Sequence, residues 1–258
     1  MAIKPILFNT EMVRAILDGR KTCTRRLVKP QPDEKHTFPL GFVTDSTEKK
    51  EVGCFGFGIN EYGGSVQYAK PPYHTDDVLY IRETWTEECG KYYYRADYDS
   101  DYLDPCETLS GGYPASYRNH PGCDGCMATS TRIHWHPSIH MSKEAARIWL
   151  KVTDVRVERL REITEAQEKA EGIRGYSKDG NLYKYAVTDD WWIDYHNKHR
   201  KSFFGGTWWQ DMPRTAKDAF SYLWDSTIKK SDLDRYGWDA NPWVWVIEFE
   251  RCEKPEGV

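Results

Sequence analysis

The chain has 258 residues with a formal net charge of −4, and 14% of its residues are aromatic. This aromatic content excludes an intrinsically disordered chain, and the negative charge excludes a global field that attracts nucleic acid. The sequence has neither the roughly 18 consecutive apolar residues of a membrane span nor the apolar core of a signal peptide, so we expect a soluble cytoplasmic protein.

The first predicted elements are a strand at Ile6–Asn9 and a short amphipathic helix after it. Asn9 and Thr10 provide capping side chains, and four apolar residues recur at helical spacing: Met12, Val13, Ile16 and Leu17. Gly19 stands where a helix needs a left-handed stop. The chain then becomes extended over Thr22–Val28.

The eight residues from Gly19 to Arg26 read GRKTCTRR and concentrate positive charge. In a strand, Thr22, Thr24 and Arg26 share one face, and Lys21 can turn toward the same side. Such a surface would grip or attack a polar ligand. The alternative is that these cations only complement the dipole of the preceding helix.

Further strands are predicted at Val78–Glu83, Ala146–Arg159 and Trp243–Arg251, the last buried on both faces. A capping box at Thr164–Gln167 and a cap at Thr215 begin two more helices. We therefore expect an α+β fold, a single domain over 1–258 built on a small mixed barrel of about five strands with two or three helices. Long insertions at 29–75, 87–136 and 174–214 decorate it, the first reading as loops and a hairpin.

Four cysteines in the second insertion form a candidate structural zinc site. Cys123 and Cys126 make a C-x-x-C pair, and Cys106 with Cys89 or a nearby histidine would complete the four ligands. The pair has an alternative interpretation as a redox motif or as unrelated thiols. No catalytic metal motif such as H-E-x-x-H is present, so we expect no cofactor for catalysis.

The pattern Gly19-x-Lys21-x-x-Thr24-x-Arg26 after this helix resembles the signature of the ASCH domain family, which is related in fold to the PUA domain. The run from Asp76 to Trp85, the helix at Thr164–Ile173 and the strand at Trp243–Arg251 resemble the family's later elements. The chain looks like the large ASCH proteins of bacteriophages and prophages. The resemblance implies a PUA-like barrel.

Thr24 stands where the family usually has glutamate. The branch that deacetylates N4-acetylcytidine also has threonine at this position. By resemblance to that branch, the catalytic residues are Lys21, Thr24 and Glu171. Thr24 would be the nucleophile, Lys21 its base and Glu171 an acid–base group. The alternatives are a solvated Glu171 and a Thr24 without a role.

Three further residues are candidates for contacting a substrate. Arg26 could hold a carbonyl or a phosphate, Glu83 is a second carboxylate, and Trp85 could stack on a base. Glu83 has the alternative of a simple ion pair, and Trp85 that of a core residue.

We therefore expect a cleft that binds a nucleobase or nucleoside and hydrolyses an N4-acyl group. Two other functions stay open. One is a non-catalytic module for RNA or a modified base, aided by the aromatic segment 191–209, and the other is a phage protein that binds a host or phage partner.

Overall fold

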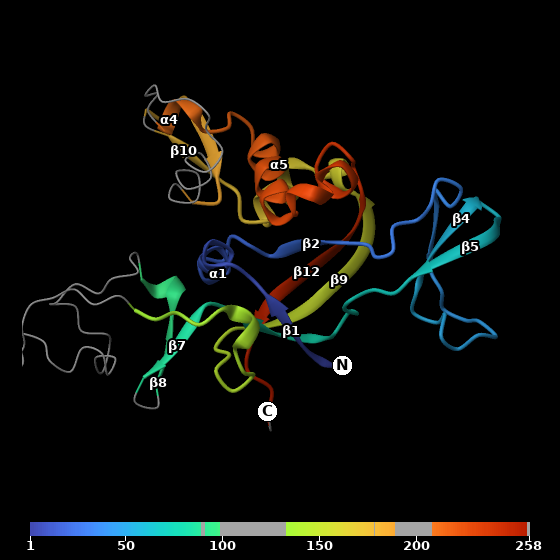
Figure 1. Cartoon of the computed structure of the whole chain (residues 1–258), viewed down its shortest axis with the longest axis horizontal. Helices are drawn as coiled ribbons and strands as arrows, with labels where there is room; N and C mark the ends of the chain where they lie inside the picture. The colour runs from blue at the N-terminus through green and yellow to red at the C-terminus, as the bar shows by residue number, and fades with distance from the viewer. Residues whose placement is uncertain (89–90, 99–132, 178, 189–207, 257–258) are drawn as a thin grey trace, which may run out of the picture. The chain divides into compact units, whose positions relative to one another are not determined.

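The computed structural model describes residues 1–88, 91–98, 133–177, 179–188 and 208–256 as a mixed α+β protein (Figure 1). These residues pack as two compact units. The first unit comprises Met1–Ala2, Gly19–Asp77 and Lys151–Glu250, and the second comprises Ile3–Asp18, Val78–Leu150 and Arg251–Val258. No described helix has the length and apolar character needed to cross a bilayer.

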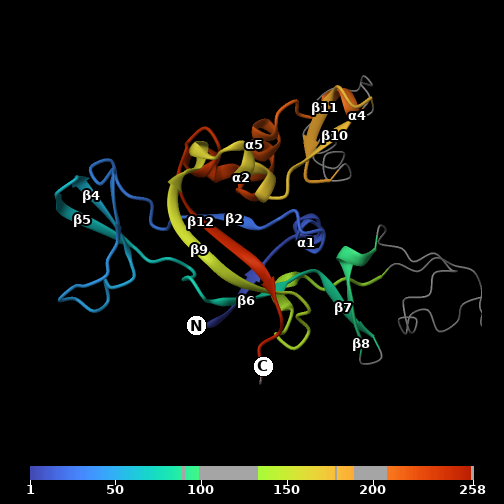
Figure 2. The ribbon, with the colours of Figure 1, turned by 180° about the vertical axis from the view of Figure 1, so that it is seen from behind.

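The largest sheet contains all five strands that the sequence predicts. Its order is β1-β6-β9-β12-β2, with bounds Ile3–Leu7, Val78–Arg82, Trp149–Arg159, Trp243–Cys252 and Cys23–Leu27. Strand β1 runs parallel to β6, whereas β12 and β2 are antiparallel. Figure 2 shows the long, curved β9 and β12 from the opposite side.

The sheet is not closed into the predicted barrel. Strands β1 and β2 stand at the two ends of the order, and closure would require the end strands to pair with each other. Among the described strands that pairing does not occur. The sheet therefore keeps two edges, and β2, which carries the basic motif, is one of them.

The buried centre of the first unit is strand β12. Val244, Trp245, Val246 and Ile247 are each at most 1% exposed, so consecutive residues on both faces are covered. Such a strand is expected in the interior of a sheet with both faces packed. The prediction of burial on both faces is confirmed.

The three predicted helices are confirmed as α1 (Thr10–Leu17), α2 (Glu165–Ala170) and α5 (Ala216–Thr227). Asn9, Thr164 and Thr215 cap them through their side chains. Gly19 and Gly172 follow α1 and α2 with φ of +73° and +103°, as a left-handed stop requires. The other helical segments among the described residues are short: α4 (Trp208–Asp211), α6 (Leu233–Tyr236), and 3₁₀ turns at Arg95–Asp97, Ser138–His140, Leu160–Glu162 and Lys230–Asp232.

The insertion at 29–75 forms a three-stranded antiparallel sheet, one strand more than the predicted hairpin. Its strands are β3 (Phe38–Phe42), β4 (Phe55–Asn60) and β5 (Gly63–Ala69). Phe42 and Phe55 bring their rings within 6.1 and 6.2 Å of Trp245. Aromatic packing of this kind fixes the insertion to β12 within the first unit.

Two hairpins lie in the other insertions. Strands β7 (Trp85–Glu88) and β8 (Lys91–Tyr94) pair in the second unit, and β10 (Arg174–Ser177) and β11 (Tyr183–Ala186) pair in the first.

Replacing Asn9 with alanine is expected to lower the free energy of unfolding by about 1 kcal/mol, the usual loss of an N-cap. The Asn9 side chain accepts a hydrogen bond from the Met12 backbone N–H at 2.9 Å, which alanine cannot do. Urea denaturation of both proteins measures the difference. Asn9→Asp keeps the acceptor and should unfold like the original chain, and an equal loss in both variants would contradict the capping role.

Candidate functional site

The basic motif wraps the C-terminus of α2. The Thr22 backbone N–H donates to the Ala170 carbonyl at 2.9 Å, and Lys21 Nζ and Arg20 Nη1 donate to the Glu171 and Gly172 carbonyls at 3.0 and 2.7 Å. The last carbonyls of a helix have no partner within the helix and attract cations. The motif follows α1 in the sequence, but its cations and backbone bind the C-terminus of α2, which lies about 150 residues further along the chain.

Lys21 and Glu171 form a buried ion pair. Lys21 Nζ lies 2.6 Å from Glu171 Oε2, and the two side chains are 0% and 4% exposed. The amine and the acid that the family resemblance implies are thus in direct contact. Because the Lys21 side chain has no exposed surface, a substrate can reach its amine only if neighbouring groups move.

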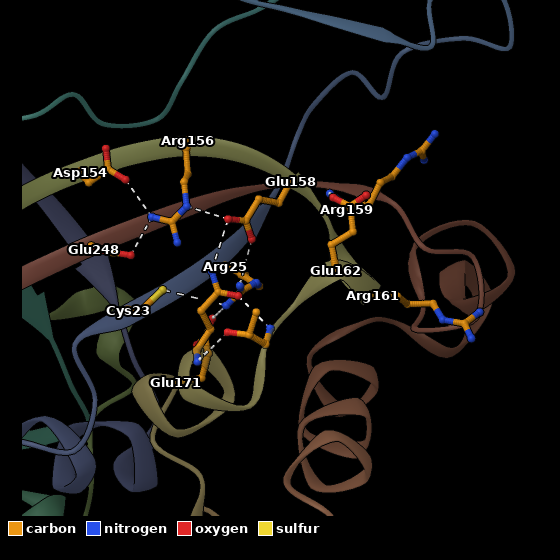
Figure 3. Close-up of polar contacts among 12 residues, drawn as sticks. Cys23, Arg25, Asp154, Arg156, Glu158, Arg159, Arg161, Glu162, Glu171 and Glu248 are labelled. Atoms are coloured by element: carbon orange, nitrogen blue, oxygen red, sulfur yellow. Dashed lines mark hydrogen bonds and ion pairs between the residues drawn. The ribbon is translucent and has the colours of Figure 1, made fainter.

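Arg25 connects this pair to a wider network of charges (Figure 3). Its Nη1 lies 3.3 Å from Glu171 Oε1, and its Nη2 lies 3.2 Å from Glu158 Oε2. Its Nε is buried without a hydrogen-bond partner among the described residues. Beyond Glu158 the network continues to Arg156, which contacts Glu158, Asp154 and Glu248 at 2.6 to 2.7 Å.

Thr24 is buried on β2, directly opposite Ile247 of β12. Successive strand side chains alternate, so Thr24 lies on the other face of β2 from Arg25. No hydrogen bond within the described part of the chain joins the Thr24 hydroxyl to Lys21 or Glu171. The structure thus brings together the lysine and the glutamate, with Arg25 beside them, and leaves Thr24 on the opposite face.

A pocket of about 480 Å³ lies beside β2, at the end of α5. Arg26 and Trp245 stand opposite each other in the β2–β12 pairing, so their side chains share one face. Arg25 is also part of the wall and links the pocket to Glu171. The complete lining is Arg25, Arg26, Leu27, Lys29, Lys70, Pro72, Tyr73, Trp224, Thr227, Ile228 and Trp245.

The Cys23 thiol is not a nucleophile in this arrangement. Burial raises its pKa to about 12, and the nearby Glu171 carboxylate adds to the effect. A thiol must ionise to attack, so Cys23 is inert near neutral pH.

Glu83 and Trp85 belong to the second unit. Glu83 is 1% exposed and accepts two hydrogen bonds from Arg147, at 3.0 and 3.1 Å. Trp85 is half-buried, with the rings of Tyr92 and His136 at 5.7 and 5.5 Å. Glu83 therefore forms an ion pair, and Trp85 belongs to an aromatic cluster.

The four predicted zinc ligands, Cys89, Cys106, Cys123 and Cys126, lie outside the described residues, as do residues 191–207 of the aromatic segment 191–209. Within the described ranges, no group of three or more His, Cys, Asp or Glu side chains is placed to hold a metal ion. Structural zinc stays a prediction.

Sequence reasoning missed the residues around the Lys21–Glu171 pair and most of the pocket. In a strand, Lys21 and Arg25 share one face, so the sequence alone could have indicated that Arg25 lies beside Lys21. The opposition of Trp245 to Arg26 depends on strand register, and Tyr73 and Lys70 approach from another segment. No local pattern indicates either contact. Comparisons of the chain with protein-family models, with curated proteins and with solved structures found no match.

Proposed function

We propose that this protein binds a nucleobase or nucleoside in the pocket beside β2. The observation that supports the proposal is the composition of the pocket, in which three aromatic rings and four cations line about 480 Å³. Binding sites for small molecules have volumes of roughly 300–1,000 Å³ and combine apolar walls with a few polar groups.

Tyr73 supplies the surface for a base, because its ring is half-buried whereas Trp224 and Trp245 are only 6% and 1% exposed. Tyr73, Trp224 and Trp245 all line the pocket. Every base has a flat π-face, and stacking of one base on an aromatic side chain contributes about 1–3 kcal/mol. Arg26, opposite Trp245, would donate to a base carbonyl from the same face.

Hydrolysis of an N4-acylated cytidine is a second candidate function, and the contact between Lys21 and Glu171 favours it. Moving one proton across their 2.6 Å contact turns the ion pair into a neutral amine and a carboxylic acid. The amine would accept the proton of Thr24 as its oxygen attacks the acyl carbon. The acid would protonate the departing N4, and water would then hydrolyse the Thr24 ester.

We place the binding function ahead of the hydrolytic function because the Lys21 side chain is fully buried and Thr24 lies on the other face of β2. A PUA-like ASCH scaffold remains part of this proposal, supported by the motif and the five-stranded α+β core. An RNA-binding module and a phage protein that binds a host partner are the alternatives.

Filling the pocket is expected to weaken binding of cytidine by at least about tenfold, which corresponds to about 1.4 kcal/mol. Thr227 is exposed and lines the pocket, so Thr227→Trp places an indole where the ligand would lie. Titration calorimetry measures the affinity. Ser226→Trp is the matched control, because Ser226 is also exposed but does not line the pocket. Equal affinity in the two variants, or no binding by the original chain, would refute the proposed site.

The hydrolytic function is tested separately with N4-acetylcytidine, by following cytidine and acetate by chromatography. Turnover by the original chain that is lost in Lys21→Ala, while circular dichroism shows that the variant is still folded, supports the reaction. Absence of turnover, or turnover that Lys21→Ala leaves unchanged, removes it and leaves the binding function intact.

A further inference from the structure

The pocket beside β2 has an unbalanced charge. Four of its eleven lining residues are cations, namely Arg25, Arg26, Lys29 and Lys70, and none is a carboxylate. The whole chain has a net charge of −4, so this is a local concentration of positive charge and not a general property of the protein. Clefts lined by one sign of charge attract ligands of the opposite sign.

The four cations differ in whether a carboxylate of the protein already neutralises their charge. Arg25 is paired with Glu171 and Glu158. Lys29 and Lys70 are exposed, and neither forms an ion pair or hydrogen bond with any residue in the described part of the chain. Lys29 and Lys70 therefore carry positive charge that no described residue compensates.

The arginines of the pocket are partly removed from water. Burial lowers the pKa of Arg26, while the nearby Tyr73 and Glu171 oppose the shift. Arg25 is 3% exposed and keeps one buried N–H without a partner among the described residues. A desolvated guanidinium gains more from an anionic acceptor than an exposed one does.

We propose that the ligand of this pocket carries a phosphate group, so that the protein binds a nucleotide in preference to a neutral nucleoside. This inference rests on the proposed nucleobase-binding function and adds a phosphate group to the proposed ligand. The base lies against the half-buried Tyr73, and the phosphate lies toward the exposed Lys29 and Lys70. The phosphate has two sources, the monoester of a free nucleotide and the phosphodiester of an RNA chain.

The test compares the affinities of cytidine, cytidine 5′-monophosphate and a short oligocytidine for the full chain by titration calorimetry. We expect the monophosphate to bind about tenfold more tightly than cytidine, since hydrogen bonds between a cation and a phosphate oxygen are stronger than those between neutral groups. Preference for the oligonucleotide over the monophosphate identifies RNA as the source, and the reverse identifies the free nucleotide.

Charge-removing variants locate the phosphate. Lys29→Gln and Lys70→Gln should each weaken binding of the monophosphate more than binding of cytidine, and so reduce the preference for the monophosphate. Lys50→Gln is the control, because Lys50 is 79% exposed and does not line the pocket. All three positions are on the surface, so folding is not at risk.

Equal affinities for cytidine and its monophosphate would overturn the phosphate inference and leave nucleoside binding in place. The phosphate inference is also overturned if Lys50→Gln reduces the preference as much as the pocket variants do. Failure of all three ligands to bind would overturn the proposed function together with the inference.

Discussion

Replacing Lys21 with methionine is expected to lower the free energy of unfolding by about 3 kcal/mol. The variant leaves the Glu171 carboxylate buried without the ammonium group that now lies 2.6 Å away. The expected loss is at the lower end of the range for broken buried pairs, because Arg25 still reaches Glu171 at 3.3 Å. Urea denaturation at neutral pH measures it.

Two further variants test the cause of this loss. Lys21→Met combined with Glu171→Gln removes both charges of the pair and should recover part of the stability, because no carboxylate is then left buried without its ammonium group, and Arg25 keeps Glu158 as a counter-charge. Lys169→Met breaks the exposed pair between Lys169 and Glu165 and should change stability little. If Lys21→Met were as mild as Lys169→Met, the Lys21–Glu171 contact would not be a buried pair in solution.

Replacing Arg147 with methionine is expected to destabilise the protein by about 3 kcal/mol near neutral pH, and by less as the pH falls. Arg147 holds the buried Glu83 through two hydrogen bonds, contacts Asp97 at 2.7 Å and lies 4.0 Å from the Tyr94 ring centroid. Without it, Glu83 is a buried carboxylate with no counter-charge in the described part of the chain. Such a group is costly only when it is ionised.

The direction of the pH dependence follows from the pKa of Glu83. Burial raises this pKa, and Arg147 opposes the rise, so removing Arg147 raises it further. A carboxyl group with a raised pKa binds its proton more tightly in the folded state than in the unfolded state. Its contribution to stability is therefore complete below the ordinary value of 4.5 and is lost as the pH rises through the folded-state pKa.

Urea denaturation of Arg147→Met between pH 4 and pH 8 checks this expectation. The difference from the original chain should grow with pH and level off above the folded-state pKa of Glu83. In the double variant Glu83→Gln with Arg147→Met the growth should disappear, because no carboxylate is left to ionise. A pH-independent difference in Arg147→Met would show that Glu83 is solvated.

The elements that the sequence predicts are those whose signals are local. Asn9, Thr164 and Thr215 are caps that act within three residues of themselves, and Gly19 and Gly172 end helices through their own φ angles. Strand β12 has an uninterrupted apolar run, which by itself indicates burial on both faces. Each of these features depends on a short stretch of chain.

The predicted barrel is not confirmed, because the five-stranded sheet of the described residues is open. Whether end strands pair depends on the twist and register of the entire sheet, and no single strand carries that information. Strand β3 was missed for a related reason, since Gly41 and Pro39 weaken the alternation by which a strand is recognised.

By itself, the sequence determined the five core strands, the three capped helices and the concentration of basic residues at the start of β2. Only the tertiary structure decided what those basic residues meet. Lys21 and Glu171 are 150 residues apart along the chain, and Glu83 and Arg147 are 64 apart. A pairing over such distances is set by how the whole chain packs, because the free energy of burying a charge depends on every group around it.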